Sequence, residues 1–224
     1  MKRQAVDYRG FRLSRIVEPQ YRHLLLLSGW IVYFLLFVLT EKLIPLERCH
    51  LVHSVLDDRI PFREEFVVFY VGWYGLVFGA LLYYIRYDVA RFRHLQVLLI
   101  ITQMTAMAAY ILWPSRQDLR PEVFPRENVF TWIVSLIYEL DTPTGVCPSL
   151  HVAYSVGIAT TFLGDRCANR GWKAAVCVLA VLISLSTMFI KQHAALDVAT
   201  GALLGLLAEL AVRRLFREKR RGNP

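Results

Sequence analysis

The chain has 224 residues, of which 56% are hydrophobic, and a formal net charge of +8. Soluble domains of this length are about 45–50% apolar. The excess here lies in long blocks, which is typical of an integral membrane protein and excludes an ordinary soluble domain. The basic residues gather beside these blocks, so we expect the basic termini to contact anionic membrane lipids and we expect no nucleic-acid partner.

The first 21 residues are polar and basic, and the apolar block that follows has no small-residue cleavage site. This pattern indicates a retained first membrane helix and not a signal peptide. No linker or repeat divides the rest. We therefore predict a basic cytoplasmic segment over residues 1–21, a single membrane domain over 22–213, and a basic cytoplasmic tail over 214–224.

Six segments are long and apolar enough to cross about 30 Å of hydrocarbon. They are residues 22–43, 65–85, 94–113, 149–164, 171–190 and 193–212. With the N-terminus in the cytoplasm, 18 of the 26 Lys and Arg residues fall inside and 8 outside, as the positive-inside rule requires. The prediction is an all-α bundle of six transmembrane helices, with both termini cytoplasmic.

Smaller patterns suggest how the bundle is built. In the longest loop, residues 127–140 have apolar side chains at helical spacing, which predicts an amphipathic helix that lies on the outer membrane surface or caps the bundle. GLVFG at 75–79 and GALLG at 201–205 fit the pattern of close helix packing, with packing inside the monomer preferred. Asp57 and Asp58 fit a helix cap better than head-group recognition.

Two histidines and an aspartate form the candidate catalytic site. In the predicted topology, His151 opens the fourth span, and His193 and Asp197 open the sixth, all at the outer membrane face. Residues i and i+4 share a helix face, so Asp197 can hold one ring nitrogen of His193 and make the other a better nucleophile or base. Ionisable groups within apolar spans are costly and tend to be functional. The alternative is ordinary polar residues at a helix end.

The surroundings of these residues suit an anion such as phosphate. Two helix N-termini offer free N–H groups and positive dipole ends. Ser149 can cap the fourth span or donate to the anion, and Arg120, Arg116 and Lys191 are candidate phosphate-binding cations, with Arg126 in the same loop. Each cation can also be a solvated loop charge. A metal site on the histidines and aspartate is a weaker alternative, because no further ligand cluster is visible.

Short motifs connect the chain to a known superfamily. PSLH at residues 148–151 and S-T-x5-H-x3-D at 186–197 resemble the motifs P-S-G-H and S-R-x5-H-x3-D of the type-2 phosphatidic acid phosphatase and vanadium haloperoxidase superfamily. Arg-Pro at 120–121 resembles the end of its first motif, K-x6-R-P. More loosely, CHLVHSVLDDRIPF, LRPEVFPRENVFT and DTPTGVCPSLH look like a bacterial subgroup. The resemblance therefore implies a multi-pass protein of a bacterial plasma membrane.

The resemblance also implies a mechanism that needs neither metal nor cofactor. His193 would attack phosphorus and form a phosphohistidine, Asp197 would orient and stabilise it, and His151 would protonate the leaving oxygen and then activate the acceptor. The first interpretation is a phosphatase that hydrolyses a phosphomonoester or pyrophosphate on a lipid.

Three positions depart from the motifs. Trp113 and Thr187 stand where the superfamily has its lysine and arginine, and Leu150 replaces the glycine. The sphingomyelin and inositol-phosphorylceramide synthases show the same loss, so a phospholipid head-group phosphotransferase is the alternative. A third hypothesis is a catalytically silent lipid-binding protein of the same fold.

Cys49 and Cys147 both fall in predicted outer loops. A disulfide between them would tie the first outer loop to the catalytic loop, and two free thiols are the alternative.

Overall fold

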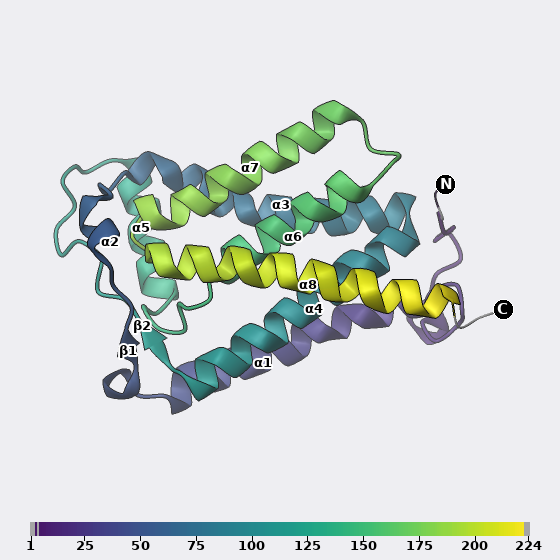
Figure 1. Ribbon diagram of the computed structural model, residues 1–224, viewed down its shortest axis with the longest axis horizontal. Coiled ribbons are helices and arrows are strands. Elements are labelled where there is room, and N and C mark those ends of the chain that lie inside the picture. Colours follow the sequence, from purple (N-terminus) through teal and green to yellow (C-terminus); the bar gives the residue numbers. More distant parts are fainter. Residues whose placement is uncertain (1–2, 4, 222–224) are drawn as a thin grey trace.

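The computed structural model describes residue 3 and residues 5–221, without the side chains of 219–221. Lys2 and the charges at the end of the predicted tail lie outside this part. Six long helices run side by side along the longest axis (Figure 1). They are α1 (Ser28–Leu43), α3 (Val67–Tyr87), α4 (Val89–Leu112), α6 (Leu150–Gly164), α7 (Arg170–Phe189) and α8 (Ala195–Arg221).

Five stretches are long and apolar enough to cross a membrane: Arg22–Leu43, Glu64–Tyr87, Val89–Leu112, Arg170–Phe189 and Ala195–Glu218. The remaining predicted span forms α6, whose 15 residues extend over only about 22 Å. This helix packs against α4, α7 and α8 in the centre of the bundle, and most of its side chains are buried. The helix α6 is therefore shorter than the other predicted spans, and the number of six membrane crossings stays a prediction.

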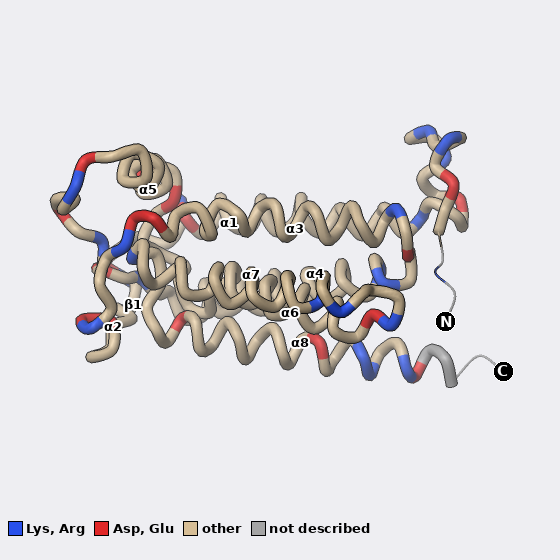
Figure 2. The backbone as a smooth tube through the Cα atoms, turned by 90° about the horizontal axis from the view of Figure 1, so that it is seen from above, with Lys and Arg blue, Asp and Glu red and all other residues tan. Residues whose placement is uncertain are grey.

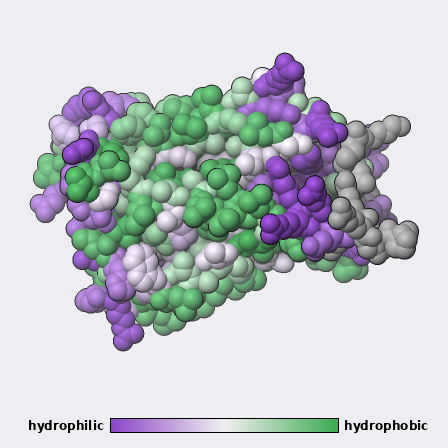
Figure 3. Space-filling view, viewed as in Figure 1, coloured by the Kyte–Doolittle hydropathy of each residue, from purple (hydrophilic) through white to green (hydrophobic). Residues whose placement is uncertain are grey.

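The bundle has two polar ends and an apolar middle. Both ends of the described chain lie at one end of the molecule (Figure 1). The other end carries α2 (Val55–Arg59), α5 (Val129–Leu140) and two short parallel strands, β1 (His50–Leu51) and β2 (Ser115–Arg116). Charged residues gather at the two ends (Figure 2), and apolar side chains dominate the surface between them (Figure 3). This distribution is the one that a membrane-embedded bundle requires.

Side-chain caps decide where several helices begin. The Asp88 carboxylate accepts hydrogen bonds from the backbone N–H groups of Ala90 and Arg91, so α4 begins five residues before the predicted apolar segment. Asn128 caps α5 in the same way, and Asn169 caps α7. At its far end α8 continues as one helix to Arg221. The helix thus runs through residue 214, where the predicted tail starts, and the division of the chain into segments stays a prediction.

The predicted glycine pattern holds α6 and α8 together. A Cβ atom at Gly201 would lie 2.4 Å from the carbonyl oxygen of Ser149, and one at Gly205 would lie 2.6 Å from that of Ala153. Only glycine allows this approach. The second pattern behaves differently, because Cβ atoms at Gly75 and Gly79 would meet nothing within 4 Å. The prediction of packing inside the monomer is thus confirmed for GALLG and wrong for GLVFG.

The predicted amphipathic helix is α5, which crosses the end of the bundle. One face packs against α3, with Val134 fully buried in the cluster that also contains Tyr70 and Ile190. The opposite face is apolar but exposed, with 60% of Trp132 and 85% of Leu140 accessible. The helix caps the bundle and also presents an unpaired apolar face.

Candidate active site

His193 and Asp197 form a pair where α7 turns into α8. The Nδ1 atom of His193 lies 3.4 Å from the Oδ2 atom of Asp197. The same oxygen accepts a hydrogen bond of 2.9 Å from the backbone N–H of Ala194, which fixes the carboxylate. Asp197 is fully buried, and His193 is 9% exposed. With Nδ1 directed at the carboxylate, Nε2 is the ring nitrogen left to react.

Backbone hydrogen bonds hold the turn that carries His193. The N–H groups of Gln192 and His193 both donate to the carbonyl of Thr187, at 2.9 and 3.0 Å. The first N–H group of α8, at Ala195, donates to the Asp57 carboxylate at 2.7 Å. The other oxygen of Asp57 closes the capping box of α2 with Ser54. The capping prediction for Asp57 is therefore confirmed, and the same side chain also anchors the start of α8.

His151 lies in the first turn of α6, facing His193. The two imidazole rings are 5.9 Å apart between centroids. The ring of His151 stacks on Tyr70 and packs against Trp73, each with a centroid distance of 4.4 Å. Its Nε2 atom is buried and has no partner among the described residues. The structure thus brings the two predicted histidines together, from two different helices.

Ser149 connects the two helices through its backbone. Its N–H donates to the carbonyl of Asp197 at 3.0 Å, so the start of α6 is bonded directly to the first turn of α8. Its hydroxyl is buried without a partner among the described residues and does not line the cavity described next. Its observed role is to set the position of one helix relative to the other.

A cavity of about 310 Å³ adjoins the histidines. Aromatic side chains from α1 and α3 form much of its wall, and α1 packs on α4 and makes little direct contact with α3. Phe34, Tyr74 and Phe78 line the cavity and are also 51–60% exposed on the side of the bundle. The cavity therefore opens sideways between α1 and α3, within the apolar part of the surface.

Arg120, the first of the predicted phosphate-binding cations, is occupied by protein groups. Its guanidinium donates to the Oε1 atom of Gln192 at 2.6 and 3.1 Å, and to the carbonyls of Tyr138 and Asp141. It lies 4.5 Å above the Tyr138 ring. Burial lowers the pKa of Arg120, although Asp141, Tyr138 and Tyr70 act to raise it. Arg120 thus holds the loop and Gln192 in place and does not itself line the cavity.

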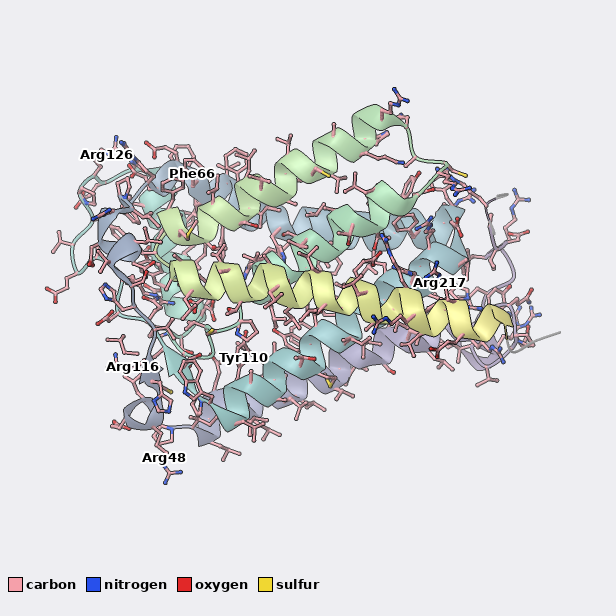
Figure 4. All side chains as sticks on the ribbon, in the orientation of Figure 1. Arg48, Phe66, Tyr110, Arg116, Arg126 and Arg217 are labelled. Carbon is pink, nitrogen blue, oxygen red and sulfur yellow. The ribbon has the colours of Figure 1, made fainter. Side chains whose placement is uncertain are left out.

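The other predicted cations also stand apart from the cavity. Lys191, which has a positive φ of 56°, donates to the carbonyls of Asp57 and Ile60 at 2.8 and 2.6 Å. Arg126 pairs with Glu64 at 2.9 Å. Arg116 lies in β2 near the same end of the bundle (Figure 4). The described residues that line the cavity include no lysine or arginine.

The sequence did not predict two residues that line the cavity, Gln192 and Asp141. The Nε2 atom of Gln192 is buried without a partner among the described residues, while its Oε1 atom is held by Arg120. Asp141 follows the last residue of α5 and lines the cavity with His193. Burial raises its pKa to about 6, although His193 and Arg120 act in the opposite direction. Gln192 could have been suspected as the neighbour of His193, but nothing in the sequence pattern predicts that the side chain of Asp141 enters the cavity wall.

The departures from the motifs have structural explanations. The hydroxyl of Thr187 donates to the carbonyl of Ser184 and the residue is buried inside α7. Trp113 ends α4 and stacks on His50, with ring centroids 5.2 Å apart. Neither side chain lines the cavity, so neither substitutes for the missing cation.

Cys49 and Cys147 are both free in the structure, which agrees with the alternative of two free thiols. The Cys147 thiol lies 3.3 Å from the hydroxyl of Thr200 on α8, and the Cys49 thiol donates to the carbonyl of Pro45 at 3.7 Å. Each buried thiol thus has a separate partner.

A metal site was the weaker alternative for the histidines and the aspartate. Within its described part, the structure has no group of three or more His, Cys, Asp and Glu side chains placed to hold a metal ion.

Part of the chain matches known proteins. Residues 112–221, which contain His151, His193 and Asp197, match the sequence model of the PAP2 superfamily. A stretch of 65 residues is 40% identical to an uncharacterized protein of Methanocaldococcus jannaschii, covering 29% of this chain. The match spans only 26% of that relative's length. No solved structure matches the chain.

Proposed function

Because the chain belongs to the PAP2 superfamily, we propose that it is a multi-pass membrane enzyme that breaks a phosphate ester bond of a lipid through a phosphohistidine on His193. The superfamily supports phosphatase or phosphotransferase activity on lipid phosphates. The observation that carries the proposal is the buried His193–Asp197 pair, with His151 facing it at 5.9 Å beside an aromatic cavity.

In the first chemical step, Nε2 of His193 attacks phosphorus and the bond from phosphorus to the leaving oxygen breaks. His151 gives that oxygen a proton, and Asp197 stabilises the positive charge that develops on the His193 ring. In the second step, His151 takes a proton from the acceptor, whose oxygen attacks phosphorus. The bond between phosphorus and nitrogen then breaks and His193 is regenerated.

The phosphate oxygens would be bound without direct contact to a cation. The buried side-chain amide of Gln192 lies beside Tyr70 and next to His193, where its Nε2 atom can donate to phosphate, and the N-terminus of α6 adds a positive dipole end. Arg120 would act through Gln192, whose Oε1 atom it holds at 2.6 Å. Gln192 would then supply the hydrogen bond that the motif arginine supplies elsewhere in the superfamily.

The sideways opening suits a substrate that stays in the membrane. A lipid in the bilayer could pass its head group between α1 and α3 and keep its acyl chains outside. The distribution of basic residues supports termini in the cytoplasm and a cavity at the outer face of the plasma membrane. The exposed apolar face of α5 would then lie in the outer membrane interface.

The acceptor decides between the two enzyme classes. With water as acceptor the protein is a lipid phosphatase. A specific observation also favours the second candidate, a head-group phosphotransferase. No lysine or arginine occurs among the described residues of the cavity wall, and a phosphomonoester with nearly two negative charges finds little compensation there.

The test uses purified protein in lipid nanodiscs at neutral pH with EDTA. One reaction contains phosphatidate, and another contains a phospholipid donor with diacylglycerol or ceramide as acceptor. Free phosphate identifies a phosphatase, and a new phospholipid without free phosphate identifies a transferase. Either product must disappear in His193→Ala and persist in the control His53→Ala, whose imidazole pairs with Asp58 away from the cavity. Product formation that survives in His193→Ala would refute the phosphohistidine, and no product with any donor would favour the silent lipid-binding protein.

A further inference from the structure

Asp141 is the one carboxylate among the described residues that line the cavity. Its backbone is fixed on both sides, because its N–H donates to the carbonyl of Ile137 at 2.9 Å and its carbonyl accepts from Arg120 at 2.8 Å. No described group donates a hydrogen bond to its carboxylate. The backbone position of Asp141 is therefore fixed in the wall that also contains His193, and its carboxylate is available as an acceptor.

This placement is unusual for a site that binds phosphate. A carboxylate repels a phosphate group, and it repels a doubly charged phosphomonoester about twice as strongly as a singly charged phosphodiester. The cavity wall offers no lysine or arginine to offset this repulsion within the described part of the chain. An uncharged hydroxyl group, by contrast, gains a charge-assisted hydrogen bond from the same carboxylate.

We propose that Asp141 determines specificity by accepting a hydrogen bond from a hydroxyl of the lipid head group, so that the cavity takes a phosphodiester lipid with a polyol head group. This inference rests on the proposed function of His193. The bond from phosphorus to the diacylglycerol oxygen breaks, and His151 protonates that oxygen. The head-group phosphate is then bonded through phosphorus to Nε2 of His193, with its hydroxyl on Asp141. The hydroxyl oxygen of a second lipid attacks phosphorus and transfers its proton to His151, and the bond between phosphorus and Nε2 breaks.

Other charged groups near Asp141 allow a matched control. His193, Arg120 and Glu41 of α1 all act on the pKa of this carboxylate. Glu41 accepts a hydrogen bond from the Thr142 hydroxyl at 2.6 Å and does not line the main cavity. The substitution Glu41→Gln therefore removes a negative charge from the same region, while the side-chain oxygen of Gln can still accept the hydrogen bond from Thr142, which lines the cavity.

The experiment measures transfer of the head group to isotopically labelled diacylglycerol in nanodiscs. Phosphatidylinositol and phosphatidylglycerol carry head-group hydroxyls, phosphatidylcholine has none, and phosphatidate is the phosphomonoester. We expect the wild type to favour the two polyol lipids. In Asp141→Asn, kcat/KM for them should fall roughly 10- to 100-fold, the loss typical of a hydrogen bond to a charged group. Phosphatidylcholine turnover should hardly change, and phosphatidate hydrolysis should rise. Glu41→Gln should behave as wild type.

Several results would overturn the inference. An equal loss for all lipids in Asp141→Asn would show a structural role, and Asp141→Glu, which keeps the charge, checks this by restoring part of the preference. A wild type without preference for polyol lipids, or without turnover of them, also rejects it. The His193→Ala variant distinguishes a failure of the proposed role of Asp141 from a failure of the proposed function of His193. If it abolishes turnover while Asp141→Asn has no selective effect, only the role of Asp141 fails. If turnover survives in His193→Ala, the proposed function itself fails.

Discussion

Replacing Gly201 by alanine tests whether the close contact of α6 and α8 positions the candidate catalytic residues. The new Cβ atom would lie 2.4 Å from the Ser149 carbonyl oxygen, and 3.2 Å from both its carbonyl carbon and its nitrogen. An ordinary contact needs about 3.4 Å or more, so the two helices must separate by about 1 Å. All three contacted atoms are backbone, and a side-chain rotation cannot relieve the overlap.

The separation of α6 and α8 in Gly201→Ala would move the candidate catalytic residues. The hydrogen bond of 3.0 Å from the Ser149 N–H to the Asp197 carbonyl crosses the same interface, and His151 follows two residues after Ser149. Moving α8 by about 1 Å would therefore misplace His193 relative to His151. A displacement of this size costs up to about 100-fold in rate, and overpacking lowers the free energy of unfolding by about 1–3 kcal/mol.

The matched control is Gly79→Ala on α3. A Cβ atom there meets nothing within 4 Å, and the substitution brings the same gain in helix propensity, up to about 1 kcal/mol. Turnover in nanodiscs and the thermal unfolding midpoint are compared for both variants. We expect Gly201→Ala to lose activity and stability while Gly79→Ala loses neither. If Gly201→Ala matches Gly79→Ala in both measurements, the reasoning from helix contact is refuted.

Four further predictions follow from the site. Asp197→Asn should leave the protein folded but lower kcat by about 10²- to 10⁴-fold, because His193 loses its orienting carboxylate; steady-state kinetics and circular dichroism check this. Arg120→Lys should raise KM and lower the unfolding midpoint, since lysine cannot hold Gln192 and two carbonyls together; an unchanged KM would argue against the role of Gln192. The pKa of Asp141, raised to about 6 by burial, predicts that transfer from polyol lipids falls as the pH drops through about 6, where the carboxylate gains a proton. A pH profile of Asp141→Asn should lack this component. All four cysteines should react with maleimide after unfolding without reductant, and two protected thiols in the mass spectrum would show a disulfide.

The helices of the bundle could be read from the sequence because each depends on local properties. Apolar runs and positional charge located α3 and α7 to within two residues and α1 and α4 to within six, and helical spacing located α5. The first helical residue was less predictable. Asp88 starts α4 five residues early through two hydrogen bonds that hydropathy does not describe. The sequence of α6 is as apolar as that of the other predicted spans, and only the structure shows that helices of the same chain surround it.

For the site, the sequence by itself determined the reacting groups. The spacing of His193 and Asp197 places both at the start of one helix, and the motif around His151 supplied the third member. Two histidines and an aspartate can act as nucleophile, acid or base in any fold, so the residue types alone limit the kinds of reaction. The glycines of GALLG also predicted a close helix contact. It is the contact of α6 with α8 that brings the two histidines together, and only a residue without a Cβ atom permits it.

Only the tertiary structure decided what surrounds the reacting groups. Arg120, Arg116 and Lys191 looked equivalent as loop cations, but Arg120 and Lys191 are bonded to protein carbonyls and none of the three lines the cavity. Asp141 opens the quoted segment DTPTGVCPSLH, but nothing in that pattern predicts that its side chain enters the cavity wall. The physical reason is that a side chain's charge is a local property, whereas its partners and its burial depend on segments far apart in the chain. Those segments meet only when the bundle is packed.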